Sequence, residues 1–144
     1  MSFDLNNRKF SSVTNTENSD VGSQTVFYYR QEGEMVWADY GGGSVRRGSL
    51  IARWVEENLL EMHYQHLSTD NEFKTGRCLS RPEQLSDGRL RMHEEWQWTS
   101  SDQSSGTSII SVEARNPFFL NSLLTANQTL SLLGLTLKFP LISL

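Results

Sequence analysis

Residues 86–99 read SDGRLRMHEEWQWT, and this stretch decides the fold class. The pair Asp87-Gly88 predicts a hairpin turn, because glycine tolerates the positive φ that such turns need. After the turn, large apolar residues recur at even-numbered positions: Leu90, Met92, Trp96 and Trp98. A period of two is the spacing of one face of a β-strand. The stretch therefore predicts a turn followed by a strand with one buried face.

Similar runs fill the chain on both sides of this stretch. Short segments rich in aromatic and β-branched residues alternate with turn residues about every ten residues, which is typical of an all-β chain. The expected strands are 8–16, 24–31, 35–40, 45–55, 59–67, 73–81, 89–99 and 107–115. Strands joined by such short turns pair in sequence order and antiparallel. Closure into an up-and-down barrel of about eight strands would leave no edge exposed, so we predict this barrel, with a two-sheet sandwich as the alternative.

Alternation within the runs sorts the side chains into an inner and an outer set. Glu94 falls on the inner face with Trp96 and Trp98, where a carboxylate is costly to bury without a partner. The other residues expected inside are Thr25, Phe27, Tyr29, Val36, Ala38, Tyr40, Leu60, Met62, Tyr64, His66, Gly76, Cys78, Ser80, Leu90 and Met92. The expected interior is thus aromatic, with small residues opposite large ones. A slip of one residue in register would invert the two sets.

Composition excludes several classes of protein. The chain has 144 residues, with Lys+Arg 13 and Asp+Glu 17, which gives a net charge of -4. A nucleic-acid-binding protein usually carries a basic stripe, so we predict no nucleic-acid partner. A single cysteine cannot form an internal disulfide or a cysteine-rich zinc site. The first residues, MSFDLNNRKF, lack a charged-then-apolar signal pattern, which predicts a cytoplasmic protein.

The composition changes at Asn116-Pro117. Residues 117–144 contain one charged side chain and ten leucines. We therefore predict a barrel domain over residues 8–116 and an apolar C-terminal extension over residues 117–144. The extension could insert into a membrane, pack on an apolar patch, or lack a fixed order. Membrane contact is expected only if residues 117–137 insert.

Three motifs extend the analysis beyond composition. They are Tyr40-x-Gly42-Gly43-x-Val45-x-x-Gly48-x-Leu50, Gly76-x-Cys78-x-Ser80-x-Pro82-Glu83, and Asp87-Gly88-Arg89-x-Arg91-x-His93-Glu94-x-Trp96-Gln97-Trp98-Thr99. Together they resemble a family of small uncharacterised microbial β-barrel proteins, often labelled "N-acetylglutamate synthase". The resemblance covers about residues 8–113. The predicted barrel is also similar to the lipocalin and avidin folds, a likeness that concerns the fold and carries no function.

The family label implies an acetyltransferase. Transfer from acetyl-CoA needs a Gly-rich, basic loop that binds pyrophosphate and leads into the N-terminus of a helix. The glycine cluster of this chain, Gly41-Gly42-Gly43, joins two predicted strands instead. We therefore lean towards a protein that is not an enzyme and predict no catalytic residue.

The histidines and the cysteine have simpler interpretations than a reactive site. His63 and His66 are three residues apart, so on a strand they face opposite ways and cannot chelate one ion. His93 could neighbour His63 across strands. We predict no metal site, and histidines that lie on the surface or in cross-strand pairs. Cys78 alternates with small residues, which predicts a packed thiol.

The leading functional prediction is a barrel that binds a small apolar or aromatic molecule in its interior or at its mouth. Aromatic walls and one orienting carboxylate would form the site, from Tyr40, Tyr64, Glu94, Trp96 and Trp98. Glu94 could equally belong to a structural hydrogen-bond network. The alternative function is a structural or interaction protein with a filled barrel, forming a homodimer; an acetyltransferase ranks third. The sequence does not identify a cofactor.

Overall fold

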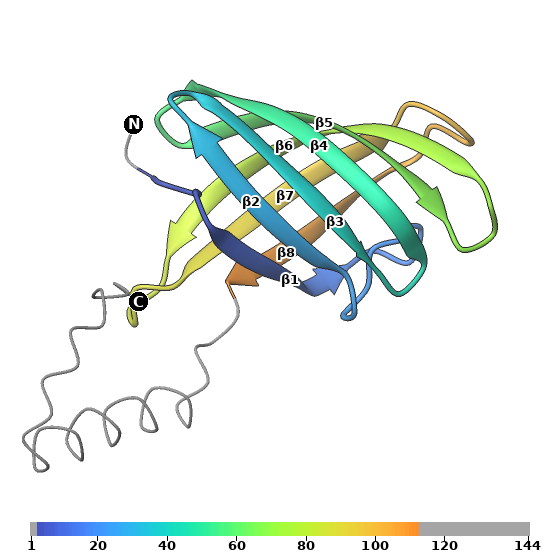
Figure 1. Ribbon diagram of the computed structural model, residues 1–144, viewed down its shortest axis with the longest axis horizontal. Helices are drawn as coiled ribbons and strands as arrows, with labels where there is room; N and C mark the ends of the chain where they lie inside the picture. Colours follow the sequence, from blue (N-terminus) through green and yellow to red (C-terminus); the bar gives the residue numbers. More distant parts are fainter. Residues whose placement is uncertain (1–2, 113–144) are drawn as a thin grey trace, which may run out of the picture. The chain divides into compact units, whose positions relative to one another are not determined.

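The computed structural model describes residues 3–112. Within them lie eight strands: β1 Arg8–Asn15, β2 Val26–Glu32, β3 Met35–Gly42, β4 Val45–Glu56, β5 Leu59–Ser68, β6 Phe73–Gln84, β7 Leu90–Trp98 and β8 Ser105–Val112. Each strand pairs antiparallel with the next, and β8 pairs with β1, so the sheet closes into a barrel (Figure 1). The all-β barrel prediction is confirmed, and the two-sheet sandwich is wrong.

Every predicted run overlaps one strand of the barrel. The end of the last run, residues 113–115, lies outside the described residues, as do the domain boundary at residue 116 and the predicted extension 117–144. The described part of the chain contains no helix that is long and apolar enough to cross a membrane.

The turn at Asp87-Gly88 closes the β6–β7 hairpin. Gly88 has φ +86°, a conformation that a residue with a Cβ rarely adopts. The backbone N–H of Leu85 donates to the carbonyl of Arg89 at 2.8 Å, and the Asp87 side chain accepts from the backbone N–H of Arg89 at 3.0 Å. These contacts fix the register of β7 and so decide which of its residues face inward.

The predicted inner face is confirmed. On β7, Leu90, Met92, Trp96 and Trp98 are buried, and the residues between them are half-buried or exposed. The same alternation runs along β3, β5 and β6. The centre of the barrel is filled by fully buried side chains, among them Phe10, Tyr29, Val36, Leu60, Met92 and Ile110.

The segments on either side of β1 pack at opposite ends of the barrel. Before the strand, Leu5 is fully buried and Phe3 stacks on Trp54 with 6.3 Å between ring centroids. After the strand, residues 16–25 cross to the start of β2 and pack Val21 against the core. We call residues 16–25 the mouth segment, since the candidate site lies beneath it.

Three glycines lie under aromatic rings of the neighbouring strand. The facing pairs are Tyr40 with Gly48, Tyr64 with Gly76, and Trp96 with Gly106. A Cβ added to any of these glycines would overlap with atoms of the facing ring. The rings can therefore lie flat against the wall of the barrel, which confirms the prediction of small residues opposite large ones.

Candidate functional site

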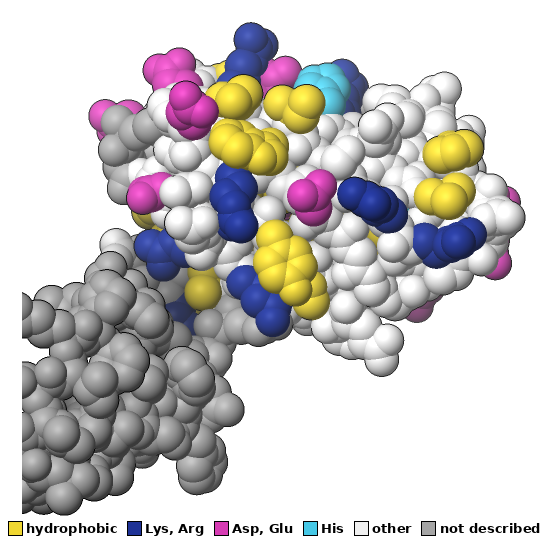
Figure 2. All heavy atoms as spheres, in the orientation of Figure 1, with side chains coloured by type: hydrophobic (Ala, Val, Ile, Leu, Met, Phe, Trp, Pro, Cys, Tyr) yellow, Lys and Arg dark blue, Asp and Glu magenta, His cyan; other side chains and the backbone are white. Residues whose placement is uncertain are grey.

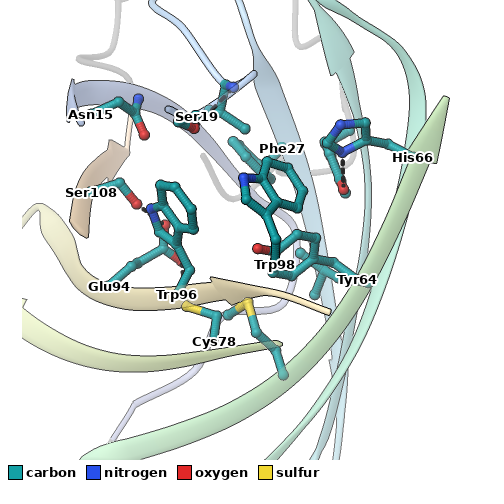
Figure 3. Close-up of a pocket in the computed structure, with 14 residues that line it drawn as sticks. Asn15, Ser19, Phe27, Tyr64, His66, Cys78, Glu94, Trp96, Trp98 and Ser108 are labelled. Atoms are coloured by element: carbon teal, nitrogen blue, oxygen red, sulfur yellow. Dashed lines mark hydrogen bonds between the residues drawn. The ribbon is translucent and has the colours of Figure 1, made fainter. Parts of the chain in front are cut away.

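A cavity lies inside the barrel at the end that the mouth segment covers (Figure 3). Its volume is about 50 Å³, room for a few water molecules at roughly 10–15 Å³ each. Several lining residues, including Asn15, Ser19 and Tyr64, are half-buried rather than buried. The structure places all five predicted ligand-binding residues around this one cavity: Tyr40, Tyr64, Glu94, Trp96 and Trp98.

Glu94 of β7 is the carboxylate of the cavity. Its Oε1 accepts a hydrogen bond from the Ser108 hydroxyl at 3.0 Å, and the Cys78 thiol lies 3.8 Å from its Oε2. Burial raises the pKa of Glu94 to about 7, although both hydrogen bonds act in the opposite direction. The carboxyl group therefore keeps its proton at pH values where an ordinary glutamate is already ionised. It belongs to a structural network and also lines the cavity.

Glu94 is part of a polar row that crosses four strands. In the register of the barrel, Asn15 faces Ser108, Ser108 faces Glu94, and Glu94 faces Ser80. Asn15 Oδ1 and the Ser80 hydroxyl are buried and have no hydrogen-bond partner among the described residues. Figure 3 shows Asn15, Ser108 and Glu94 together on one side of the cavity. Of these two residues only Asn15 lines the cavity, so a polar molecule beside it would meet an unused hydrogen-bond acceptor.

Aromatic rings form the rest of the lining. Trp98 meets the rings of Trp96 and Tyr64 edge to face, with centroids 5.5 and 5.8 Å apart. Phe27 stacks on Tyr40 at 4.9 Å and so covers the inner face of that ring. Tyr64 and Trp96 each have one face against a glycine of the wall, which turns the other face towards the interior.

Asp20 holds the mouth segment to the barrel. Its Oδ2 lies 2.9 Å from His66 Nε2, and its Oδ1 accepts from Lys74 Nζ at 3.0 Å. On the other side of the imidazole, His66 Nδ1 lies 2.9 Å from the Tyr40 hydroxyl. A carboxylate can only accept, so Nε2 donates to Asp20. The Tyr40 hydroxyl also lies 3.3 Å from the carbonyl oxygen of Gln65.

A second set of contacts holds the same segment from the β7–β8 side. The indole N–H of Trp98 donates to the carbonyl of Asn18 at 3.1 Å. The Asn18 amide donates to the Ser104 hydroxyl and to the carbonyl of Ser105, both at 3.0 Å. The mouth segment is therefore attached to β5, β6, β7 and the start of β8. A molecule that enters the cavity from this end has to pass these contacts.

The Asp20–His66–Tyr40 chain has the order of a catalytic triad, but its chemistry is different. Burial is the main cause that raises the pKa of Tyr40 well above its ordinary value, so the phenol stays protonated at neutral pH. Burial likewise raises the pKa of Cys78 and keeps it a thiol. The chain of hydrogen bonds positions the mouth segment and generates no phenolate. No group of three metal-binding side chains occurs among residues 3–112.

Two expectations about the histidines are wrong. His66 is buried, 3% exposed, which confirms the inner-face position that alternation gave it and shows that the surface interpretation is wrong for this histidine. His63 and His93 are not neighbours, because β6 lies between their strands: His63 faces Arg77, and His93 faces Arg81.

Sequence reasoning also missed residues of the site, chiefly Asp20, Asn15 and Ser108. Asp20 belongs to a loop, where strand alternation carries no information. The alternation did put His66 on the inner face, and a buried imidazole needs partners, so that position was a signal that a group such as Asp20 had to be present.

Comparison with known proteins adds one finding to this geometry. A family model described as avidin-like protein matches residues 3–112. The match includes every strand of the barrel, the mouth segment and all the residues that line the cavity. Neither a curated protein nor a solved structure matches the chain.

Proposed function

The chain belongs to the avidin-like protein family, and from this we propose that it binds a small molecule in the cavity beneath the mouth segment. Eight-stranded barrels have an interior just wide enough to hold one small ligand, as in streptavidin. Ligand sites are mainly apolar and contain a few polar groups that fix orientation. Aromatic walls around Glu94 fit this description, and this arrangement is the observation that carries the proposal.

The volume of the cavity limits what can bind. About 50 Å³ accepts a small molecule or the head group of a larger one. The remainder of a larger ligand would have to leave through the mouth, past Ser19 and Val21. Trp96, Trp98 and Tyr64 would contact the apolar part of the ligand, and Glu94 would orient its polar part.

The test is native mass spectrometry of the full chain. The protein is mixed with d-biotin and, separately, with a cell extract filtered to remove macromolecules. We expect a one-to-one adduct from at least one of the two mixtures. Trp96→Ala should lose the adduct, because it removes one wall of the cavity. Trp37→Ala should keep it, since Trp37 lies half-buried on the outer face of β3.

A wild-type protein that forms no adduct in either mixture would overturn the binding proposal. So would an adduct that survives in Trp96→Ala with unchanged stoichiometry, because the molecule would then sit elsewhere. Both variants are first checked for folding by circular dichroism, so that loss of structure is not mistaken for loss of binding.

The second candidate is a structural or interaction protein with a filled barrel. Two observations favour it: the small cavity and the exposure of large apolar side chains, with Phe73 82% and Ile51 66% exposed. Figure 2 shows hydrophobic side chains at the surface, interspersed with basic ones. A dimer in the same spectra, without an adduct, would support this candidate. The homodimer and the cytoplasmic location stay predictions.

Acetyl transfer has no support from the glycine cluster. Gly42 is the last residue of β3, and Gly43 lies in the turn before β4. Both have positive φ, +110° and +63°, as a tight hairpin requires. The cluster therefore shapes a hairpin and leads into a strand, where a phosphate-binding loop would lead into a helix.

A further inference from the structure

The charge of the cavity is one-sided. Of the described residues that line it, Glu94 carries a carboxyl group, and none is a lysine or an arginine. The one basic side chain in this lining is His66, and its Nε2 is already paired with Asp20 at 2.9 Å. The hydrogen-bond partners of Glu94 in the described part of the chain are the neutral groups of Ser108 and Cys78. Lys74, at the mouth, is already paired with Asp20. The cavity therefore has a negative group without a positive partner.

The aromatic lining presents ring faces to the same space. Tyr64 and Trp96 each lie with one face against a glycine, so the other face is turned inward. The inward face of an aromatic ring carries the negative part of its quadrupole, which attracts cations. Trp98 already attracts one cation, since Lys74 Nζ lies 5.1 Å from the centroid of its ring.

The polar row adds hydrogen-bond acceptors. Asn15 Oδ1 is buried without a partner among residues 3–112, and the two oxygens of Glu94 can accept more bonds than Ser108 and Cys78 supply. A ligand that satisfies this row brings N–H donors. A quaternary ammonium group has no N–H donor, whereas a primary ammonium group has three and a secondary one has two.

We propose that the cavity recognises a small organic cation, a protonated primary or secondary amine with an apolar body. This inference rests on the proposed function and names its ligand class. The ammonium group donates to Glu94 and Asn15, and its adjacent methylene groups pack on the faces of Trp96 and Tyr64. An anionic ligand would meet the carboxylate and the ring faces with the wrong sign of charge.

The test uses three probes of similar size and shape: n-butylamine, butan-1-ol and butyrate. Binding is followed through the tryptophan indole signals in NMR spectra of the full chain. At pH 8 we expect the amine to bind at least tenfold more tightly than the alcohol, and butyrate not to bind. Equal or tighter binding of the alcohol or of butyrate would overturn the cation proposal and leave the binding function intact. Absence of binding by all three probes, together with no adduct from the extract, would overturn both.

The pH dependence supplies a second measurement on the wild-type protein. A cation binds the ionised carboxylate, so the affinity for butylamine should rise about tenfold between pH 6 and pH 8 as Glu94 loses its proton. The other titratable groups that interact with Glu94 across the barrel are Cys78 of β6, Tyr29 of β2, Tyr40 of β3 and Tyr64 of β5. Burial raises the pKa of each, so all four stay neutral over this range. An affinity that falls with pH would contradict the proposal.

The variant Glu94→Gln isolates the charge from the shape of the side chain. Its preference for butylamine over butan-1-ol should shrink to the part that the ring faces supply, and its pH dependence should be lost. Glu95→Gln is the matched control, because Glu95 is the next residue and faces outward. A Glu94→Gln protein that keeps the full tenfold preference for the amine would overturn the proposal.

Discussion

Glu94 is the residue that gives the barrel interior its chemical character. Its position follows from the alternation of β7, which placed a carboxyl group between buried methionine and tryptophan side chains. The turn at Asp87-Gly88 fixes that register, so the orientation of Glu94 could be predicted from the sequence. Its partners could not, because Ser108 and Cys78 reach it from two other strands.

The raised pKa of Glu94 predicts a dependence of stability on pH. An ordinary glutamate has a pKa of 4.5, and Glu94 in the folded protein has one of about 7. Between these values the unfolded chain releases its proton first, so stability falls as the pH rises and levels off above pH 7. The loss is on the order of 3 kcal/mol, at about 1.4 kcal/mol per pH unit. Glu94→Gln should not show it.

Urea denaturation at pH 5 and pH 8 measures this effect. The free energy of unfolding of the wild type should drop between the two values by more than that of Glu94→Gln. Glu95→Gln should follow the wild type, since Glu95 is exposed on the outer face. Parallel pH profiles for wild type and Glu94→Gln would mean that the carboxyl group is not protonated in the folded state.

His66 and Asp20 mark the limit of residue-level prediction. They are 46 positions apart in the sequence, and neither a motif nor a period connects a loop residue to a strand that far away. Alternation reports which way a side chain points within its own strand. It does not report what a loop brings to meet that side chain, so the contact was found only in the structure.

At the scale of the strands, the inward and outward faces could be predicted from the sequence for a physical reason. A barrel wall has water on one side and a core on the other, and this contrast forces the period of two that is visible in the chain. The mouth segment has no such constraint. Its polar and small residues are typical of any loop, and its attachment depends on Asp20 and Asn18, which bond to strands elsewhere in the barrel.

The pairing of glycines with rings leads to a prediction for Gly76→Ala. The new methyl group would overlap the ring of Tyr64 and push it into the cavity. We expect a loss of about 1–3 kcal/mol in the free energy of unfolding, as for other overpacked cores, together with weaker binding of any ligand in the cavity. Thermal and urea denaturation measure the first effect, and native mass spectrometry measures the second.

Gly41→Ala is the control for that variant. Gly41 lies on strand β3, has no positive φ, and an added Cβ there would make ordinary contact with the backbone of Arg46. Both substitutions restrict the unfolded chain equally, so the difference between them reports the collision with the ring. Equal stability of the two variants would show that Tyr64 has room to move.

At the scale of the whole molecule, the strand ladders differ in length. The β1–β2 ladder joins only Arg8–Ser11 to Val26–Tyr29. The β4–β5 ladder runs along both strands from end to end, from the pair Val45 and Ser68 to the pair Glu56 and Leu59. The short ladder also lies next to the mouth segment, which continues from β1 into β2.

Hydrogen exchange should therefore be uneven around the barrel. We expect the backbone amides shared by β1 and β2 to exchange at least tenfold faster than those shared by β4 and β5, because local opening breaks fewer bonds there. Exchange measured by NMR under native conditions tests this. A uniform rate on all strands would mean that the barrel opens only by global unfolding.

Because β8 pairs with β1, the chain could begin at a different strand and still form the same closed barrel. Phe10 and Val112 face each other in adjacent strands, so a short peptide linker could join the last strand to the first. A circularly permuted chain that begins at Gln103 and ends at Asp102 would keep the Asp87-Gly88 turn and rebuild the same ladders, with its new termini in an exposed turn. Those termini would lie in the loop that follows β7, the strand that carries Glu94, Trp96 and Trp98. A reporter domain fused there would be joined directly to that wall of the cavity, and the barrel would become a scaffold for a genetically encoded sensor.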